Sequence, residues 1–206
     1  MLGARFRQAR PATLTDMVAV TRTTREQWID EGLRALASGG PESVRVEVVS
    51  ASLGVTKGGF YGQFGSRDAF LEALLETWER ESTHDVRQRV EAEGGDPRRK
   101  LRRAGVMTFS SERLLPVDLA IREWARRDPD VAARLKRVDE QRMGYLRELF
   151  TTIVGSRPED VEARSVLAFC LAIGHHFLAA EHGPFSRTTV LKQAMGILVD
   201  QEVKSG

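Results

Sequence analysis

The chain has 206 residues, of which 41% are hydrophobic and 29% are charged. This balance is typical of soluble globular proteins and excludes a fibrous or disordered class, and the length suffices for one large or two small domains. The formal net charge of +2 neither requires nor excludes a nucleic-acid partner, but it argues against a protein that packages DNA without sequence preference.

Residues 1–23 are predicted to form a basic, flexible arm. Residues 1–25 carry five arginines and one aspartate, a local balance of +4. A solvated tail and an arm that approaches the minor groove of DNA are both compatible with this composition. Polar and charged residues stand where the apolar core of a secretory signal would lie, so no secretory signal is expected.

A first helix is predicted from Thr24, which together with Gln27 approximates a capping box. Four apolar residues of this helix share one face, as the helical period requires: Trp28, Ile29, Leu33 and Leu36. The sequence Gly-Gly-Pro at residues 39–41 ends the helix.

A helix-turn-helix is predicted between Arg45 and Phe70. Two crossing helices need a small residue at the crossing point, a residue that tolerates the turn and an apolar anchor in the second helix. Ser50, Gly54 and Phe60 fit these three roles. The same geometry occurs in helical corners that do not bind DNA, so the pattern alone leaves both interpretations open.

The second helix of the motif is predicted to begin after Thr56, a good N-cap whose position directs free backbone N–H groups toward phosphate. Phe60 and Phe64 are four residues apart and form its buried stripe. The opposite face carries a lysine, a tyrosine and several glycines. Glycines weaken a helix but allow close approach to a phosphate backbone, which favours DNA binding over a purely structural corner.

The segment LGVTKGGFYGQFGSRDAF resembles the helix-turn-helix pattern of the tetracycline-repressor (TetR) family, and the resemblance extends from Thr24 to about Trp78. It implies that Lys57, Gly58 and Tyr61 contact DNA and that Arg67 clamps a phosphate. The family usually has a large residue followed by His where this chain has Gly62 and Gln63. The complete set of predicted DNA-binding residues is Arg45, Thr56, Lys57, Gly58, Gly59, Tyr61, Gly62, Gln63 and Arg67.

The rest of the chain is predicted to be helical as well. A helix capped by Ser66 should run to the Gly-Gly-Asp-Pro break at residues 94–97, and five more are expected near 98–112, 116–127, 129–154, 158–182 and 186–203. The fold class is therefore all-α with about nine helices. We expect a DNA-binding domain over residues 24–70 and a ligand-binding and dimerisation domain over 71–206.

The helix expected at 158–182 is apolar over most of its circumference, and together with the last helix it is predicted to form a four-helix interface in a homodimer. The resemblance implies the same mode of dimerisation. A dimer would hold two recognition helices about 34–36 Å apart, a distance that equals one helical turn of the DNA in a palindromic operator. Residues Met107, Phe109, Trp124, Phe169, His176 and Phe177 are candidates for an apolar effector pocket, although aromatic and Met residues at helical spacing also form ordinary cores.

No catalytic motif or cofactor-binding motif is recognised, so no catalytic residue, cofactor or metal site is predicted. The single cysteine, Cys170, excludes an intramolecular disulfide and favours a reducing compartment. The longest weakly polar run, residues 166–180, is shorter than the roughly 20 residues of a membrane span. We expect a cytoplasmic, ligand-released repressor of the TetR type. The alternative is a helical-bundle protein, ligand-carrying or enzymatic, that keeps the corner but binds no operator.

Overall fold

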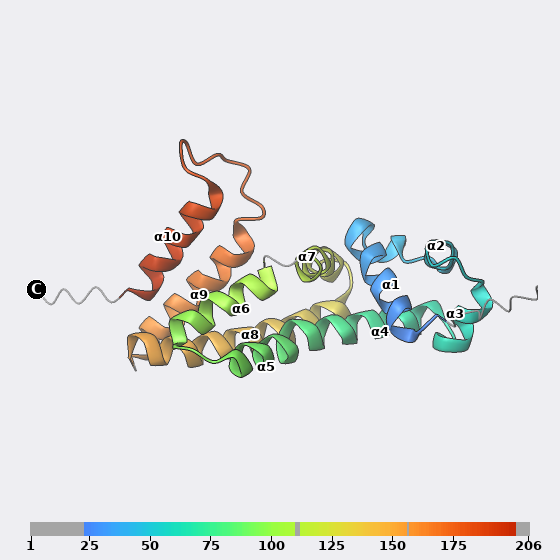
Figure 1. Cartoon of the computed structure of the whole chain (residues 1–206), viewed down its shortest axis with the longest axis horizontal. Coiled ribbons are helices and arrows are strands. Elements are labelled where there is room, and N and C mark those ends of the chain that lie inside the picture. Colours follow the sequence, from blue (N-terminus) through green and yellow to red (C-terminus); the bar gives the residue numbers. More distant parts are fainter. Residues whose placement is uncertain (1–22, 110–111, 156, 201–206) are drawn as a thin grey trace, which may run out of the picture.

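The computed structural model describes residues 23–109, 112–155 and 157–200, and these residues form helices, turns and loops without a strand. The molecule is elongated, with the helix-turn-helix at one end and the last helix, α10, at the other (Figure 1). The basic arm predicted over residues 1–23 lies almost entirely outside the described residues. Among the described residues the expected all-α class is confirmed.

The N-terminal helices form as their local sequence predicts. Helix α1 (Arg25–Gly39) begins with the expected capping box, in which the side chains of Thr24 and Gln27 each accept a hydrogen bond from the other's backbone N–H. A short 3-10 helix, η1 (Pro41–Ser43), precedes α2 (Val46–Ser52) and α3 (Lys57–Phe64). Gly54 has a φ of +67° in the turn between α2 and α3, a conformation that favours glycine.

A single long helix connects the helix-turn-helix end to the rest of the chain. It consists of α4 (Arg67–Arg80), a π-helical turn η2 (Glu81–Asp85) and α5 (Val86–Glu93). Ser66 caps its start, because the Ser66 side chain accepts a hydrogen bond from the backbone N–H of Ala69. When this continuous helix is counted once, the described residues contain the nine helices that the sequence predicts. Figure 1 shows it running along the molecule beside α8.

Five further helices complete the chain: α6 (Pro97–Phe109), α7 (Leu114–Ala125), α8 (Pro129–Val154), α9 (Pro158–Gly174) and α10 (Arg187–Val199). The predicted extension of the helix at Pro158 as far as residue 182 was wrong, because α9 ends at Gly174. After it, backbone bonds from His176 to Ile173 and from Phe177 to Gly174 tighten the chain into a turn. Residues 177–181 are exposed, so a longer helix would gain no packing against the described part of the chain.

Two hydrophobic clusters hold these helices together. The first joins α1, α2, α3 and α4 to α7 and the start of α8, and it contains the fully buried Trp28, Trp78 and Ile121. The second joins α5, α6, α8 and α9 around Phe150. The domain boundary predicted between residues 70 and 71 falls inside α4, and the first cluster extends across it. Helix α7 is therefore built into the core of the DNA-binding end.

Candidate nucleic-acid interface

Helix α3 is anchored by aromatic packing on one side. The ring of Phe60 is fully buried and lies 5.6 Å from Trp28 and 5.1 Å from Phe70, both in edge-to-face contact. Phe64 lies 4.5 Å from Phe70. Edge-to-face aromatic pairs are stabilising beyond the area they bury. The two phenylalanines expected to form the buried stripe therefore fix the orientation of the opposite face.

That opposite face carries Lys57, Gly58, Tyr61 and Gly62, all exposed, with the partly buried Gln63 at its edge. Tyr61 keeps 52% of its surface exposed, so its hydroxyl is available to an external acceptor. A Cβ added at Gly62 would meet nothing within 4 Å, and one added at Gly58 would meet only the Thr56 hydroxyl at 3.8 Å. Because these glycines have no side chain, a phosphate backbone can approach the main chain of α3 closely.

The turn before α3 presents backbone donors as expected, with one difference. Thr56 occupies the N-cap position in an extended conformation, but its side chain makes no capping hydrogen bond within the described residues. The first N–H groups of α3 are therefore not satisfied by that hydroxyl, and the positive end of the helix dipole remains open to an anion. Gly59, also predicted to lie at the interface, is exposed but faces the Trp28 ring, 3.6 Å from the position of an added Cβ.

Lys57 is held by an acidic residue of the neighbouring helix. Its Nζ lies 2.6 Å from Oε1 of Glu47 on α2. The hydrogen bond from Lys57 lowers the pKa of Glu47, so the carboxylate is ionised and the pair is a full ion pair at neutral pH. Arg45 stands exposed at the N-cap of α2. Two of the predicted DNA contacts are thus next to α2: Arg45 occupies the N-cap position of this helix, and Lys57 pairs with Glu47 on it.

The partly buried side chain of Arg67 forms hydrogen bonds with the backbone that precedes α2. Its Nε donates to the carbonyl oxygen of Val44 at 2.8 Å, and its Nη2 donates to the carbonyl oxygen of Pro41. These bonds tie the start of α4 to η1 and to the residue that precedes Arg45. The guanidinium group has further N–H donors, so contact with a phosphate stays a prediction, but the position of Arg67 is set by these two carbonyls.

The residues predicted to line an effector pocket fall into two groups. Phe109 and Phe169 meet edge to face at 6.0 Å, and Nε2 of His176 lies 3.0 Å from the carbonyl oxygen of Phe109. Burial, followed by the neighbouring His175, lowers the pKa of His176. Met107, on the same helix as Phe109, packs on the second hydrophobic cluster.

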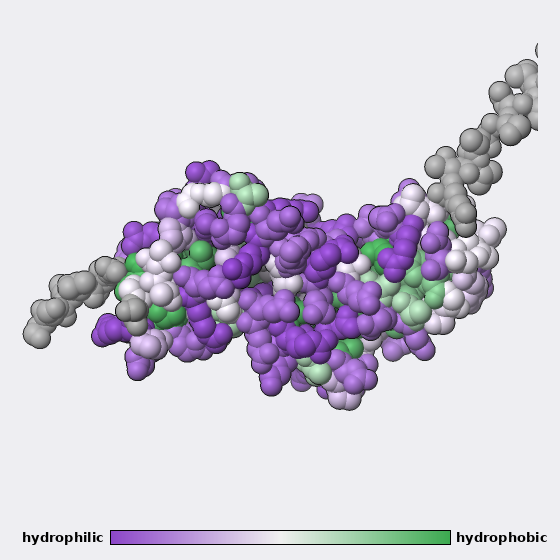
Figure 2. Space-filling view, turned by 90° about the horizontal axis from the view of Figure 1, so that it is seen from below, coloured by the Kyte–Doolittle hydropathy of each residue, from purple (hydrophilic) through white to green (hydrophobic). Residues whose placement is uncertain are grey.

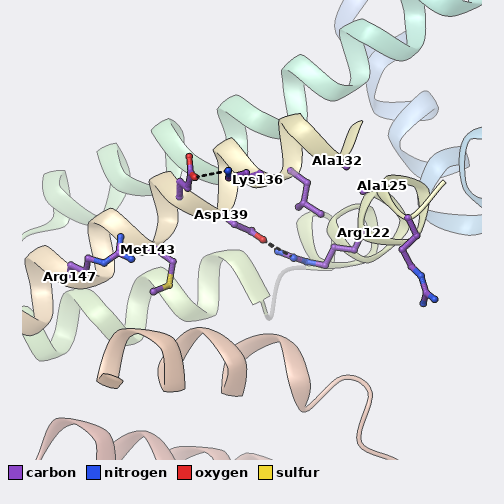
Figure 3. A pocket seen from close by; sticks show the side chains of 10 residues that line it. Arg122, Ala125, Ala132, Lys136, Asp139, Met143 and Arg147 are labelled. Carbon is purple, nitrogen blue, oxygen red and sulfur yellow. Dashed lines mark hydrogen bonds and ion pairs between the residues drawn. The ribbon is translucent and has the colours of Figure 1, made fainter. Parts of the chain in front are cut away.

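The two other pocket candidates lie apart from this group. Trp124 packs on the first cluster and donates to Oδ2 of Asp128 at 3.1 Å, while Phe177 is 68% exposed in the turn after α9. The described residues also form two hollows that the sequence did not predict. One of about 530 Å³ lies along α7 and α8 and is lined by charged side chains together with Leu135 and Met143; Figure 3 shows Met143 on α8 between Asp139 and Arg147. The other, about 720 Å³, lies between α4 and α8 and includes Trp124 in its lining.

A buried ionic network beside the first hollow was also missed. Asp118 is 1% exposed, and its oxygens accept from Trp78 Nε1 at 3.2 Å and Arg122 Nε at 2.8 Å, with Arg142 Nη1 also 2.8 Å away. Arg122 in turn binds both oxygens of Asp139 at 2.7 and 2.9 Å, a pair that Figure 3 shows. The spacing of Asp118 and Arg122, four residues apart on a predicted helix, is the signal that could have identified it.

The described residues offer no group of three His, Cys, Asp or Glu side chains placed to hold a metal ion. Over the same residues, every helix is too short or too polar to cross a bilayer.

Comparison with known proteins identifies the motif. Residues 29–74 match the sequence model of the family described as bacterial regulatory proteins, tetR family. No curated protein matches the chain. The match confirms the resemblance that the residues between Leu53 and Phe70 indicate, and it covers the helix-turn-helix and the first turns of α4.

Solved structures show that the likeness in fold extends over most of the chain. A transcriptional regulator from Saccharomonospora viridis in complex with choline has a TM-score of 0.67 at 17% identity, over 86% of this chain and 96% of that chain. PfmR, a TetR family regulator from Thermus thermophilus, gives 0.61 at 17% identity over 84% and 96%. AibR in complex with isovaleryl coenzyme A and operator DNA gives 0.60 at 16% identity over 84% and 97%.

Proposed function

We propose that this chain, whose helix-turn-helix is that of the tetR family, is a homodimeric transcriptional repressor that binds a palindromic operator and is released by a small-molecule effector. It would act in the cytoplasm, without catalysis. The observation that carries the proposal is the outer face of α3, where Lys57 and Tyr61 flank exposed glycines and the buried phenylalanines fix the orientation of that face. A recognition helix needs this combination of a rigid mount, few bulky side chains and donors at its N-terminal end.

Exposed apolar residues of the last two helices support the dimer. Helix α10 has no buried residue in the single chain, and Ile197 on it is 67% exposed. On α9, Val166 and Leu167 are 42% and 54% exposed. By contrast, Figure 2 shows a face that is mostly hydrophilic over its central part. Because a monomer rarely leaves large apolar side chains in contact with water on two adjacent helices, we infer that a second copy covers α9 and α10.

An effector site is supported by the fold and by the hollows along α8. Regulators with this fold include one in complex with choline and one in complex with isovaleryl coenzyme A. In this chain the lining of the hollow between α7 and α8 includes the apolar residues Ala132, Leu135 and Met143. The hollow and the cluster of Phe109, Phe169 and His176 are the two places where we propose that an effector binds.

Footprinting on the DNA that flanks the coding region tests operator binding, and a salt titration of the affinity measures the phosphate contribution. We expect protection of a palindrome and an affinity that falls steeply as salt increases. Lys57→Ala and Tyr61→Ala should each weaken binding without loss of helix content, whereas Lys136→Ala, which removes an exposed lysine of α8, should leave it unchanged. If no flanking fragment binds more tightly than random DNA at moderate salt, the proposal is wrong.

A further inference from the structure

An acidic residue, Glu47, lies in the first turn of α2, directly beside the exposed face of α3. Between residues 43 and 67, Glu47 is the only acidic side chain. It lies on α2 with 62% of its side chain exposed, and its Oε1 is 2.6 Å from Nζ of Lys57, whose side chain is 53% exposed. The one acid of the motif is therefore paired with the one lysine of the motif.

An acid in the first turn of α2 is favourable to the helix dipole, but the ion pair with Lys57 adds little to folding. Exposed ion pairs contribute about 0–1 kcal/mol to stability because water and salt screen them. Near DNA, however, the same pair carries a cost. A carboxylate is repelled by phosphates, and a lysine bound to it must give up that partner before it can neutralise a phosphate in full. Glu47 therefore lowers the affinity of α3 for DNA in general.

An ammonium group has three N–H donors, and the contact with Glu47 uses one of them. The remaining two are directed by that contact instead of rotating freely at the end of a four-carbon side chain. A base edge with two acceptors, such as the O6 and N7 atoms of guanine, can accept these donors while the ion pair stays closed. A lone phosphate competes with Glu47 for the same charge.

We propose that Glu47 is a specificity-determining residue, which holds Lys57 for a base edge of the operator and suppresses its binding to phosphates of unrelated DNA. This inference rests on the proposed function, because it needs an operator that α3 reads. The inference requires that Glu47 acts through Lys57. Removal of the Glu47 carboxylate should then raise the affinity for random DNA more than the affinity for the operator.

A double-mutant cycle tests this inference, with Glu47→Gln, Lys57→Ala and the double variant titrated on two duplexes by fluorescence anisotropy. One duplex has random sequence, and the other is the fragment selected by the wild-type protein from a random pool. In Glu47→Gln we expect affinity for random DNA to rise roughly fivefold, the order of one released surface ion pair in each protomer. Operator affinity should rise less, so that discrimination falls.

The salt dependence supplies a second readout. Each Lys57 that neutralises an additional phosphate steepens the slope of log affinity against log salt by about 0.9. Glu47→Ala, which cannot accept a hydrogen bond from Lys57, should act at least as strongly as Glu47→Gln. Glu26→Gln removes an exposed acid of α1 that interacts with Thr24 and Arg25 rather than with Lys57, and as the matched control it should change both affinities by one common factor.

Two results would overturn the inference while leaving the proposed function intact. The first is an equal effect of Glu47→Gln with and without Lys57, which would show a through-space charge effect only. The second is an equal gain on both duplexes. If the wild-type protein selects no sequence from the pool, both the inference and operator binding fail.

Discussion

Asp118 is predicted to be the most sensitive charged position of the fold. Its carboxylate is 1% exposed and lies 2.8 Å from Arg142 Nη1, and the side chain of Arg142 is itself only 7% exposed. Asp118→Asn removes the negative charge and keeps the shape. Arg122 still has Asp139 at 2.7 and 2.9 Å, while Arg142 keeps only its longer contact with Asp139 at 3.5 Å. The cost therefore comes chiefly from the Arg142 guanidinium, which loses its closer acid.

Leaving one partner of a buried ion pair without the other costs about 3–5 kcal/mol. Because Arg142 retains a distant acid and Asn can still accept from Trp78, we expect the lower end, about 3 kcal/mol. That is a large part of the roughly 5–15 kcal/mol by which domains are usually stable. Urea unfolding followed by circular dichroism, at one fixed protein concentration, measures the difference.

The same variant makes a prediction about pH. Burial by itself raises the pKa of Asp118, but the charges of Arg142 and Arg122 outweigh it and hold the pKa below its usual range. A carboxylate with a lowered folded-state pKa stabilises the fold above its unfolded value, about 3.9, and loses this contribution as pH falls through the folded value. The stability gap between wild type and Asp118→Asn should be constant from about pH 5 to 7 and narrow below about pH 4.

Two comparisons decide whether the reasoning is correct. Glu76→Gln changes an exposed acid of α4 and should alter stability by less than about 0.5 kcal/mol. Adding Arg142→Met to Asp118→Asn removes the orphaned charge, so the double variant should be less destabilised than the sum of the single variants. A loss below about 1 kcal/mol in Asp118→Asn, or strict additivity in the double variant, would refute the account of the network.

Glycine substitutions and exposed apolar residues give two further predictions. Gly62→Ala should stabilise the protein by about 0.5–1 kcal/mol in urea unfolding, because an added Cβ meets nothing within 4 Å. Gly32→Ala should cost about 1–3 kcal/mol, because its Cβ would lie 2.5 Å from the ring of Phe70. Leu167→Glu and Ile197→Glu should yield folded monomers in ultracentrifugation, since both residues are largely exposed in the single chain. A dimer that survives both changes would contradict the proposed interface.

Local signals predicted the elements well, because they act within a few residues. Asp128 caps α8 through the N–H groups of Asp130 and Val131, and Pro129 opens that helix at the predicted residue. Thr24, Ser66 and Gly54 likewise act on neighbouring backbone. The end of α9 was not predicted, because it is set by tertiary packing: in the described part of the chain, residues 177–181 beyond Gly174 are exposed and have no surface against which to pack.

Contacts between helices were beyond local signals. The phosphate-clamp role that the family resemblance gives Arg67 does not disclose that its guanidinium binds two backbone carbonyls. Composition likewise indicates that Phe109 and Trp124 are apolar, but not that Trp124 packs on the first cluster while Phe109 meets Phe169. Buried ion pairs depend most on the tertiary structure, since the partners Asp118 and Arg142 lie on different helices and meet only when α7 packs on α8.

Helix α7 is the element through which an effector would reach the DNA-binding helices. Its residues Val117 and Ile121 belong to the cluster that contains α1 and α3, while Arg122 on its other side lines the hollow along α8. Asp118, between them, bonds the long helix α4 through Trp78. Because Arg122 bonds both Asp118 and Asp139, a ligand that enters the hollow and displaces Arg122 would break both contacts. Since packed cores shift between discrete arrangements instead of deforming smoothly, we expect such a displacement to move α7 and α1 together and, in the proposed dimer, to change the spacing of the two recognition helices.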